Sequence, residues 1–160
     1  MGLRNPIIIL DTNIVSYIFK GGALADDYER LLVGYDARVS FATSAELQYW
    51  AEKNGRGARR RLELRVFLVD YPELPYHKQM AELCAKLMVE CEHAGRRMDW
   101  PDAWIATTAI WYGATLVTHD LGFLHIPRLR VITNSVGLGA HERESRYEGL
   151  AQSGRVSCSF

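Results

Sequence analysis

Four acidic residues lie where a predicted strand ends or a predicted helix begins: Asp11, Glu46, Asp102 and Asp120. If folding brings them together, their carboxylates repel one another, and some of them take up protons. A divalent cation removes that cost, and oxygen ligands of this kind favour Mg²⁺ or Mn²⁺ over softer metals. Because metal ions held in this way position water and neutralise charge on a phosphate, the four acids favour a site for phosphodiester cleavage.

Each of the four acids also has a purely structural interpretation. Asp11 could cap the helix that follows the first strand. Glu46 completes a capping-box pattern with Thr43. Asp102, in a first helical turn, would interact favourably with the helix dipole. Asp120 could be an ordinary turn residue. Taken singly, the structural interpretation is as good as the catalytic one for Asp11 and better for the other three, so only their common placement favours a shared site.

The elements that must position these acids alternate between strand and helix. Strands are predicted at 7–10, 38–43, 66–69, 114–118 and 129–133, and helices at 12–19, 23–33, 43–53, 56–63, 75–95 and 101–113. The first of these segments is apolar at every position, as in a strand buried on both faces. The alternation predicts an α/β fold with a parallel sheet, and ligands bind at the edge where the carboxyl ends of such strands lie.

Composition limits the location and the partners of the chain. Its 160 residues are enough for one domain, and the 48% apolar and 24% charged shares exclude disorder over most of its length. Nineteen Lys and Arg balance nineteen Asp and Glu, so a nucleic-acid partner would be held by local charge. Three cysteines without a CxxC spacing favour a reducing compartment, and no apolar run approaches the ~18 residues of a membrane span. We therefore expect a cytoplasmic protein with no membrane partner, folded over 5–134, with a weakly ordered Gly- and Ser-rich tail over 135–160.

Five segments resemble, in order, the successive signatures of PIN-domain ribonucleases: 10–13 (LDTN), 43–47 (TSAEL), 102–109 (DAWIATTA), 113–120 (GATLVTHD) and 123–129 (FLHIPRL). The first segment alone is a weak signal, but the ordered set is specific. The resemblance covers most of the chain, from about 7 to 133. It is closest to the VapC toxins of bacterial toxin–antitoxin pairs.

The resemblance implies a fold, an activity and partners. The fold would be a PIN-like three-layer α/β/α arrangement with a five-stranded parallel sheet over residues 5–134. The activity would be that of a Mg²⁺-dependent, single-strand-preferring endoribonuclease that leaves a 5′-phosphate and a 3′-hydroxyl, with Mn²⁺ as a substitute. The chain would act as the toxin of a toxin–antitoxin pair. Its partners would be RNA, a cognate antitoxin protein that covers the acidic groove, and a second copy of the chain in a homodimer.

The resemblance also implies a role for each acid. Asp11 and Asp102 would be the main Mg²⁺ ligands. Glu46 would bind the metal directly or through water and orient the attacking water, and Asp120 would complete the cluster. Supporting polar groups would come from three further residues: Asn13, Thr118 and Asp99. Asp99 would be an outer ligand or simply a helix cap.

Basic and aromatic residues outside the motifs have open interpretations. A basic run could contact RNA phosphates or form a solvated helix face: Arg56, Arg59, Arg60, Arg61 and Arg65. Two arginines just before the third motif, Arg96 and Arg97, are nearer the predicted site. Three tryptophans could stack on bases, although core or dimer packing is the commoner role: Trp100, Trp104 and Trp111. Candidate dimer surfaces lie near Tyr17, Phe19 and Trp50. Cys84 and Cys91 fit core packing, and His119 could touch a phosphate or be incidental.

Two alternative functions remain open at the level of sequence. One is a non-catalytic PIN-like module that binds RNA or a protein, which the filled acidic positions disfavour. The other is a metal-dependent phosphatase of the dehalogenase-like class. That class needs a second Asp two residues after the first, where this chain has Asn13.

Overall fold

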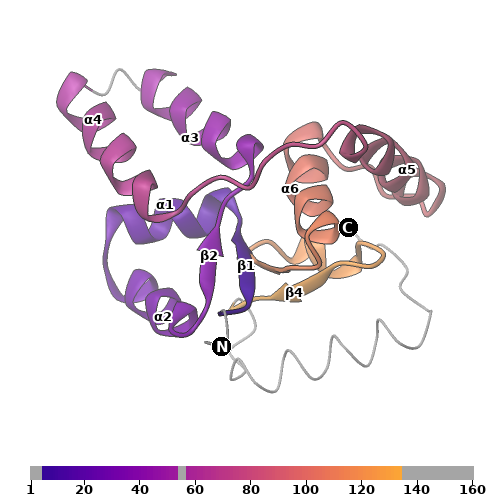
Figure 1. Cartoon of the computed structure of the whole chain (residues 1–160), viewed down its shortest axis with the longest axis horizontal. Helices are drawn as coiled ribbons and strands as arrows, with labels where there is room; N and C mark the ends of the chain where they lie inside the picture. Colours follow the sequence, from indigo (N-terminus) through magenta and orange to yellow (C-terminus); the bar gives the residue numbers. More distant parts are fainter. Residues whose placement is uncertain (1–4, 54–56, 135–160) are drawn as a thin grey trace.

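A parallel sheet forms the centre of the molecule (Figure 1). The computed structural model describes residues 5–53 and 57–134. Within these ranges the sheet has four strands in the order β2-β1-β3-β4, and every neighbouring pair is parallel. The strands are β1 (Ile7–Leu10), β2 (Asp36–Arg38), β3 (Thr115–Val117) and β4 (Arg130–Ile132). Because all four run the same way, their carboxyl ends share one edge.

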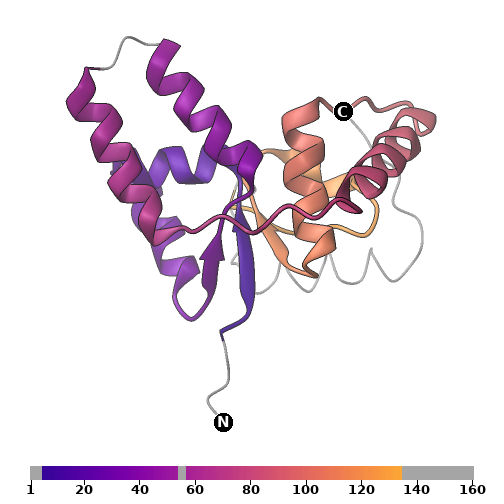
Figure 2. The same cartoon turned by 45° about the horizontal axis from the view of Figure 1, so that its top comes forward.

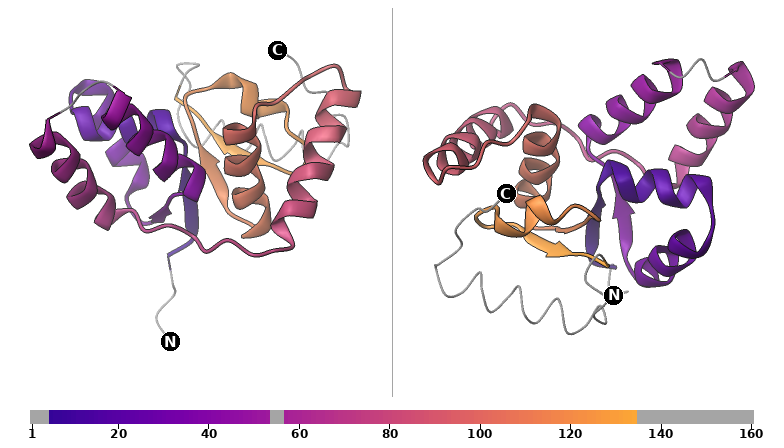
Figure 3. Two further views of the ribbon diagram at one scale, coloured as in Figure 1. Left: turned by 90° about the horizontal axis from the view of Figure 1, so that it is seen from above. Right: turned by 180° about the vertical axis from the view of Figure 1, so that it is seen from behind.

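Helices cover both faces of this sheet and complete a three-layer α/β/α fold. They are α1 (Thr12–Lys20), α2 (Ala23–Leu32), α3 (Phe41–Lys53), α4 (Ala58–Phe67), α5 (Met80–His93) and α6 (Trp100–Trp111), with the short 3₁₀ helices η1 (Leu68–Asp70) and η2 (Leu121–His125). Figures 2 and 3 show α1 to α4 on one side of the molecule and α5 and α6 on the other, with the sheet between them.

The central strand explains how one sheet supports two cores. Successive strand side chains point to opposite faces, and Ile8 and Leu10 pack with the residues of α1 and α2, whereas Ile9 packs with those of α5 and α6. All three are buried. The uninterrupted apolar run predicted at 7–10 is therefore confirmed as a strand with no solvent-exposed face.

The corner between α1 and α2 confirms the predicted end of the first helix. Gly21 and Gly22 have φ values of +76° and +106°, which residues with a Cβ rarely adopt. The backbone N–H of Gly21 donates to the carbonyls of Tyr17 and Ile18 and closes α1. Lys20 is thereby left as the last residue of the helix, on the surface.

Two predicted strands differ from the structure. The strand predicted at 66–69 is wrong, because α4 runs through Phe67 and continues as η1. Val66 and Val69 are 63% and 73% exposed, so their β-branched side chains face solvent rather than a sheet. The second strand, β2, begins at Asp36, two residues earlier than predicted. It ends at Arg38, and α3 begins at Phe41, within the range predicted as strand. The described sheet consequently has four strands, not five.

The start of the longest helix also differs from the prediction. The longest helix begins at Met80 rather than near Pro75. Among the described residues, no helix is both long enough and apolar enough to cross a bilayer. The predicted tail over 135–160 and Arg56 lie outside the described residues, and the boundaries of the predicted domain stay a prediction.

Candidate active site

Asp11 follows the central strand and is held on both carboxylate oxygens. Its Oδ1 accepts a hydrogen bond from the backbone N–H of Thr12 at 2.6 Å, and its Oδ2 accepts one from the hydroxyl of Thr118 at 2.5 Å. Thr118 is the residue after β3, which pairs beside β1 with Leu10 opposite Val117. Asp11 is 4% exposed. It caps α1, as the structural interpretation expected, and it also stands at the strand edge where a ligand would bind.

Glu46 reaches the same edge from α3, and its predicted capping role is wrong. Thr43 lies inside α3, and the Ser40 hydroxyl accepts from the Thr43 backbone N–H at 3.1 Å. The Glu46 carboxylate instead accepts from the hydroxyl of Thr12 at 2.5 Å. Since Thr12 follows Asp11 directly, this bond fixes the Glu46 side chain toward Asp11.

Asp102 and Asp120 come from the other half of the chain. Asp99 caps α6, since its carboxylate accepts from the backbone N–H of Asp102 at 3.0 Å, and this confirms the capping interpretation of Asp99. Asp102 lies in the first turn of α6, and Asp120 follows β3. Asp120 also accepts from the N–H of Gly122 at 2.7 Å, which makes it a turn residue as well.

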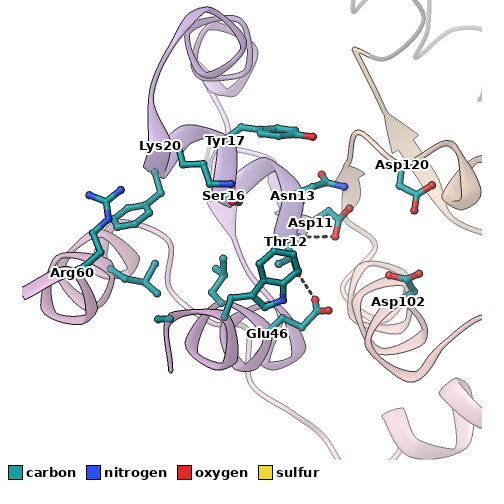
Figure 4. A pocket seen from close by; sticks show the side chains of 15 residues that line it. Asp11, Thr12, Asn13, Ser16, Tyr17, Lys20, Glu46, Arg60, Asp102 and Asp120 are labelled. Carbon is teal, nitrogen blue, oxygen red and sulfur yellow. Dashed lines mark hydrogen bonds between the residues drawn. The ribbon is translucent and has the colours of Figure 1, made fainter. Parts of the chain in front are cut away.

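The four carboxylates line one pocket of about 360 Å³. Figure 4 shows Asp11, Asp102 and Asp120 directed toward a common space, with Glu46 beside it. Burial, together with the nearby negative charges of Asp99, Asp11, Asp120 and Glu46, raises the pKa of Asp102 from 3.8 to about 7. Burial, with smaller contributions from the charges of Glu46 and Asp120, raises the pKa of Asp11 from 3.8 to about 6, even though its hydrogen bonds with Thr118 and Thr12 lower it. Both carboxyl groups are therefore costly to ionise without a nearby positive charge.

The donor types fit a hard divalent cation. Mg²⁺ is bound in proteins through carboxylate oxygens, and a cation would remove the repulsion that raises the pKa of Asp11 and Asp102. In the part of the chain that the structure describes, no group of three or more His, Cys, Asp or Glu side chains is already gathered tightly enough to hold a metal ion. The arrangement is that of mutually repelling carboxylates around a shared space.

Hydrogen bonds tie the β3–η2 connection to the rest of the site. The Thr118 hydroxyl accepts from the backbone N–H of Asp120 at 3.0 Å, and the Asn13 side chain accepts from the N–H of His119 at 3.2 Å. The His119 ring lies 2.8 Å from the hydroxyl of the buried Tyr28. Thr118 thus contacts the Asp11 carboxylate and, together with Asn13, holds the backbone that leads to Asp120, and His119 belongs to this framework. The sequence analysis gave no role to Thr12, although it lies in the segment 10–13, or to Tyr28, because no local pattern shows which distant residue either hydroxyl contacts.

Thr118→Val is expected to weaken the site while the fold survives. The change keeps the shape of the side chain but removes the hydroxyl that holds Asp11 and Asp120. Loss of a group that orients a metal ligand costs about 10- to 100-fold in metal affinity or activity. Isothermal titration with Mn²⁺ measures the affinity, and Thr108→Val, whose hydroxyl bonds only within α6, is the matched control. Equal affinities for the two variants would contradict the role given to Thr118.

The basic and aromatic candidates separate into two groups. Tyr17, Phe19, Trp50 and Arg60 line the pocket of the four carboxylates, and Arg96 and Arg97 line a second pocket beside it. The remaining candidates lie elsewhere in the molecule. Arg59 pairs with Glu63, Arg61 pairs with Glu52, and Arg65 lines a third pocket. Trp104 packs with Phe41 and Tyr76, whereas Trp100 and Trp111 are exposed. Cys84 and Cys91 are buried, which confirms their core role.

Comparison with known proteins identifies the family to which this chain belongs. The sequence model of the PIN domain family matches residues 8–129, so the chain belongs to the PIN domain family. Among curated proteins it is similar to Ribonuclease VapC4 of Mycobacterium tuberculosis, 30% identical over 102 residues that cover 62% of this chain and 78% of the relative. It is also similar to Ribonuclease VapC2 of Rickettsia felis, 29% identical over 126 residues that cover 77% and 94% of the two chains.

Solved structures agree with this classification. A chain in the crystal structure of VapBC2 from Rickettsia felis, bound to a DNA fragment from its promoter, superposes with a TM-score of 0.71 at 28% identity and covers 79% of this chain and 98% of its own. A chain of DNA-bound VapBC from Salmonella typhimurium superposes with a TM-score of 0.67 at 26% identity, covering 79% and 96%. The expected resemblance to VapC proteins and the three-layer fold are thereby confirmed.

Proposed function

We propose that this chain is a Mg²⁺-dependent endoribonuclease that prefers single-stranded RNA and acts as the toxin of a toxin–antitoxin pair. The observation that carries the proposal is the meeting of four carboxylates from four separated segments in one pocket, two of them with a raised pKa. Carboxylates that are costly to ionise together fit a site whose charge a cation balances.

Asp11 and Asp102 would hold the Mg²⁺ ion, with Glu46 and Asp120 beside them. The cation would supply neutralisation of the phosphate charge and polarisation of its oxygens. Glu46, fixed by the Thr12 hydroxyl, would orient a water for in-line attack on the phosphorus and accept its proton. The bond from phosphorus to the 3′ oxygen would break, which leaves a 3′-hydroxyl on one fragment and a 5′-phosphate on the other.

The proposed partners are inferred from the proteins that this chain is similar to. The similar curated proteins are named as ribonucleases, and the similar solved structures are of VapBC proteins bound to DNA. By analogy, a cognate antitoxin would block the acidic pocket, the chain would form a homodimer, and it would work in the cytoplasm. A gene for a small DNA-binding protein next to this one would encode the antitoxin, and addition of its product should stop RNA cleavage.

A circular single-stranded RNA tests the reaction itself, because only an endonuclease can open it. The purified chain with Mg²⁺ is expected to linearise the circle and to leave a 5′-phosphate, and excess EDTA should stop the reaction until Mg²⁺ or Mn²⁺ is restored. An intact circle at enzyme concentrations that bind the RNA would overturn the proposal in favour of a non-catalytic binding module.

A further inference from the structure

Two pockets meet at the carboxylates. The first is the pocket of about 360 Å³ described above, and the second has a volume of about 300 Å³. Asp102 and Asp120 line both of them. Each volume falls near the lower end of the roughly 300–1,000 Å³ typical of ligand sites. The acids therefore lie at the junction of two adjoining pockets, not at the bottom of a closed one.

The first pocket extends away from the acids between α1, α3 and α4. Its middle is apolar, with Phe19 and Leu64 on its walls and the indole of Trp50, 58% exposed, beside them. Its far part is basic. Arg60 lies over the Phe19 ring at 4.3 Å and also pairs with Glu63, and the ammonium of Lys20 makes no hydrogen bond or ion pair with another described residue. Figure 4 shows Lys20 and Arg60 on the side of the pocket away from Asp102 and Asp120.

The second pocket is basic too. Arg96 and Arg97 line it together with Met98 and Phe123. The Arg97 guanidinium is exposed and pairs with Glu92 at 2.8 Å. Cations thus flank the four carboxylates in both directions, although the whole chain has no net charge.

We propose that the two pockets form one track for a single strand of RNA that crosses the carboxylates. Lys20 and Arg60 would contact phosphates on one side of the scissile bond, Arg97 would contact a phosphate on the other side, and Trp50 would stack on a base. The inference rests on the proposed ribonuclease function and adds to it the residues that hold the substrate.

Electrostatics favours this occupant. Four carboxylates repel a polyanion, and a chain with no net charge has no overall field to offset that repulsion. Binding must then come from cations placed where the strand enters and leaves, which is where Lys20 and Arg97 lie. An exposed aromatic ring next to such cations is the usual platform for single-stranded nucleic acid, because every base can stack on it.

The length of the track also fits. An α-helix rises ~1.5 Å per residue, which puts Lys20 roughly 14 Å along α1 from Asp11. About two nucleotides of an extended strand bridge such a span. The substrate is accordingly a strand with unpaired bases near the cleavage site, since a base that stacks on Trp50 has left its partner.

Salt dependence of RNA binding tests the track. All variants are made in the full chain carrying Asp102→Asn, so that RNA is bound without being cut, and a short fluorescein-labelled single-stranded RNA of mixed sequence is titrated by anisotropy with Mg²⁺ present. Lys20→Ala and Arg97→Ala are each expected to weaken binding and to reduce the slope of log affinity against log salt by about 0.7, the value for one lost phosphate contact. Lys78→Ala, an exposed lysine outside both pockets, should change neither quantity.

Stacking is tested separately with Trp50. Trp50→Ala is expected to weaken RNA binding at least about fivefold without changing the salt slope, and Trp50→Phe should restore most of the affinity. In the chain with Asp102 intact, Lys20→Ala and Trp50→Ala should raise KM more than they lower kcat.

Failure of the track differs visibly from failure of the proposed function. A chain that opens circular RNA but whose Lys20, Arg97 and Trp50 variants bind RNA with unchanged affinity and slope would overturn the track alone. If these variants bind RNA normally but bind the antitoxin more weakly, the two pockets form a binding site for a peptide of the antitoxin and not for RNA. A chain that never cuts RNA would overturn the function on which the inference rests.

Discussion

Asp102→Asn is expected to lower the rate of RNA cleavage by about 10³-fold while the protein stays folded. The amide has the shape of the carboxylate but no charge with which to hold Mg²⁺, and the charge stabilisation that a metal supplies is worth several kcal/mol in the transition state, roughly 1.4 kcal/mol for each factor of ten. Single-turnover cleavage of a labelled RNA at saturating Mg²⁺ measures the loss. Asp11→Asn should behave in the same way.

Asp99→Asn is the matched control for this variant. Asp99 lies three residues away and caps α6, and asparagine is an equally good capping residue. The control should therefore keep its fold and stay within about tenfold of the unaltered rate. Full activity in both the Asp11 and the Asp102 variants would refute the assignment of the carboxylates.

Without added metal, the protein is expected to lose stability as the pH rises from 5.5 to 8. Burial and neighbouring negative charges raise the pKa of Asp102 from its ordinary value of 3.8 to about 7, and that of Asp11 from 3.8 to about 6. The folded state therefore binds protons more tightly than the unfolded state. The resulting stabilisation is complete below pH ~4 and is lost as the pH passes through the folded pKa values. Since each pH unit in the window costs about 1.4 kcal/mol per group, the two groups together should lose on the order of 2–3 kcal/mol above pH 5.5 in urea unfolding.

Two comparisons check the origin of this loss. Asp102→Asn should flatten the pH dependence and make the metal-free protein more stable at pH 8 than the unaltered chain. Mg²⁺ should raise the melting temperature more at pH 8 than at pH 5.5, because at the lower pH it competes with protons for the same oxygens. A stability that rises between pH 5.5 and 8 without metal would contradict the pKa shifts.

Local patterns were sufficient for the central strand, for the end of the first helix and for the acid that follows the central strand. The apolar run of β1 and the Gly21–Gly22 corner act through properties of a few adjacent residues, and both are confirmed. The position of Asp11 also follows from the strand before it. The pattern at 66–69 was misleading because β-branched residues favour strands only where a neighbouring strand is present, and Val66 and Val69 face solvent.

The contacts that hold the site together lie beyond any local pattern. Thr12 contacts Glu46 across 34 residues, Tyr28 contacts His119 across 91, and Thr118 contacts Asp11 across 107. Such contacts depend on which strands become neighbours and on how α1, α2 and α3 pack. The capping box expected for Thr43 and Glu46 failed for the same reason, because a long-range hydrogen bond replaced the local one.

The bond between Thr118 and Asp11 has a consequence for synthesis of the protein. Thr118, which follows β3, is added to the chain 107 residues after Asp11, and a contact between such distant segments cannot form until the intervening chain has been made. A nascent or truncated chain that ends before Thr118 would also lack Asp120, so on the proposed function it would cut no RNA. On the proposed function, the chain could cut RNA only after the segment through Asp120 has been made and has folded against β1, so the ribosome that makes it would be spared until then.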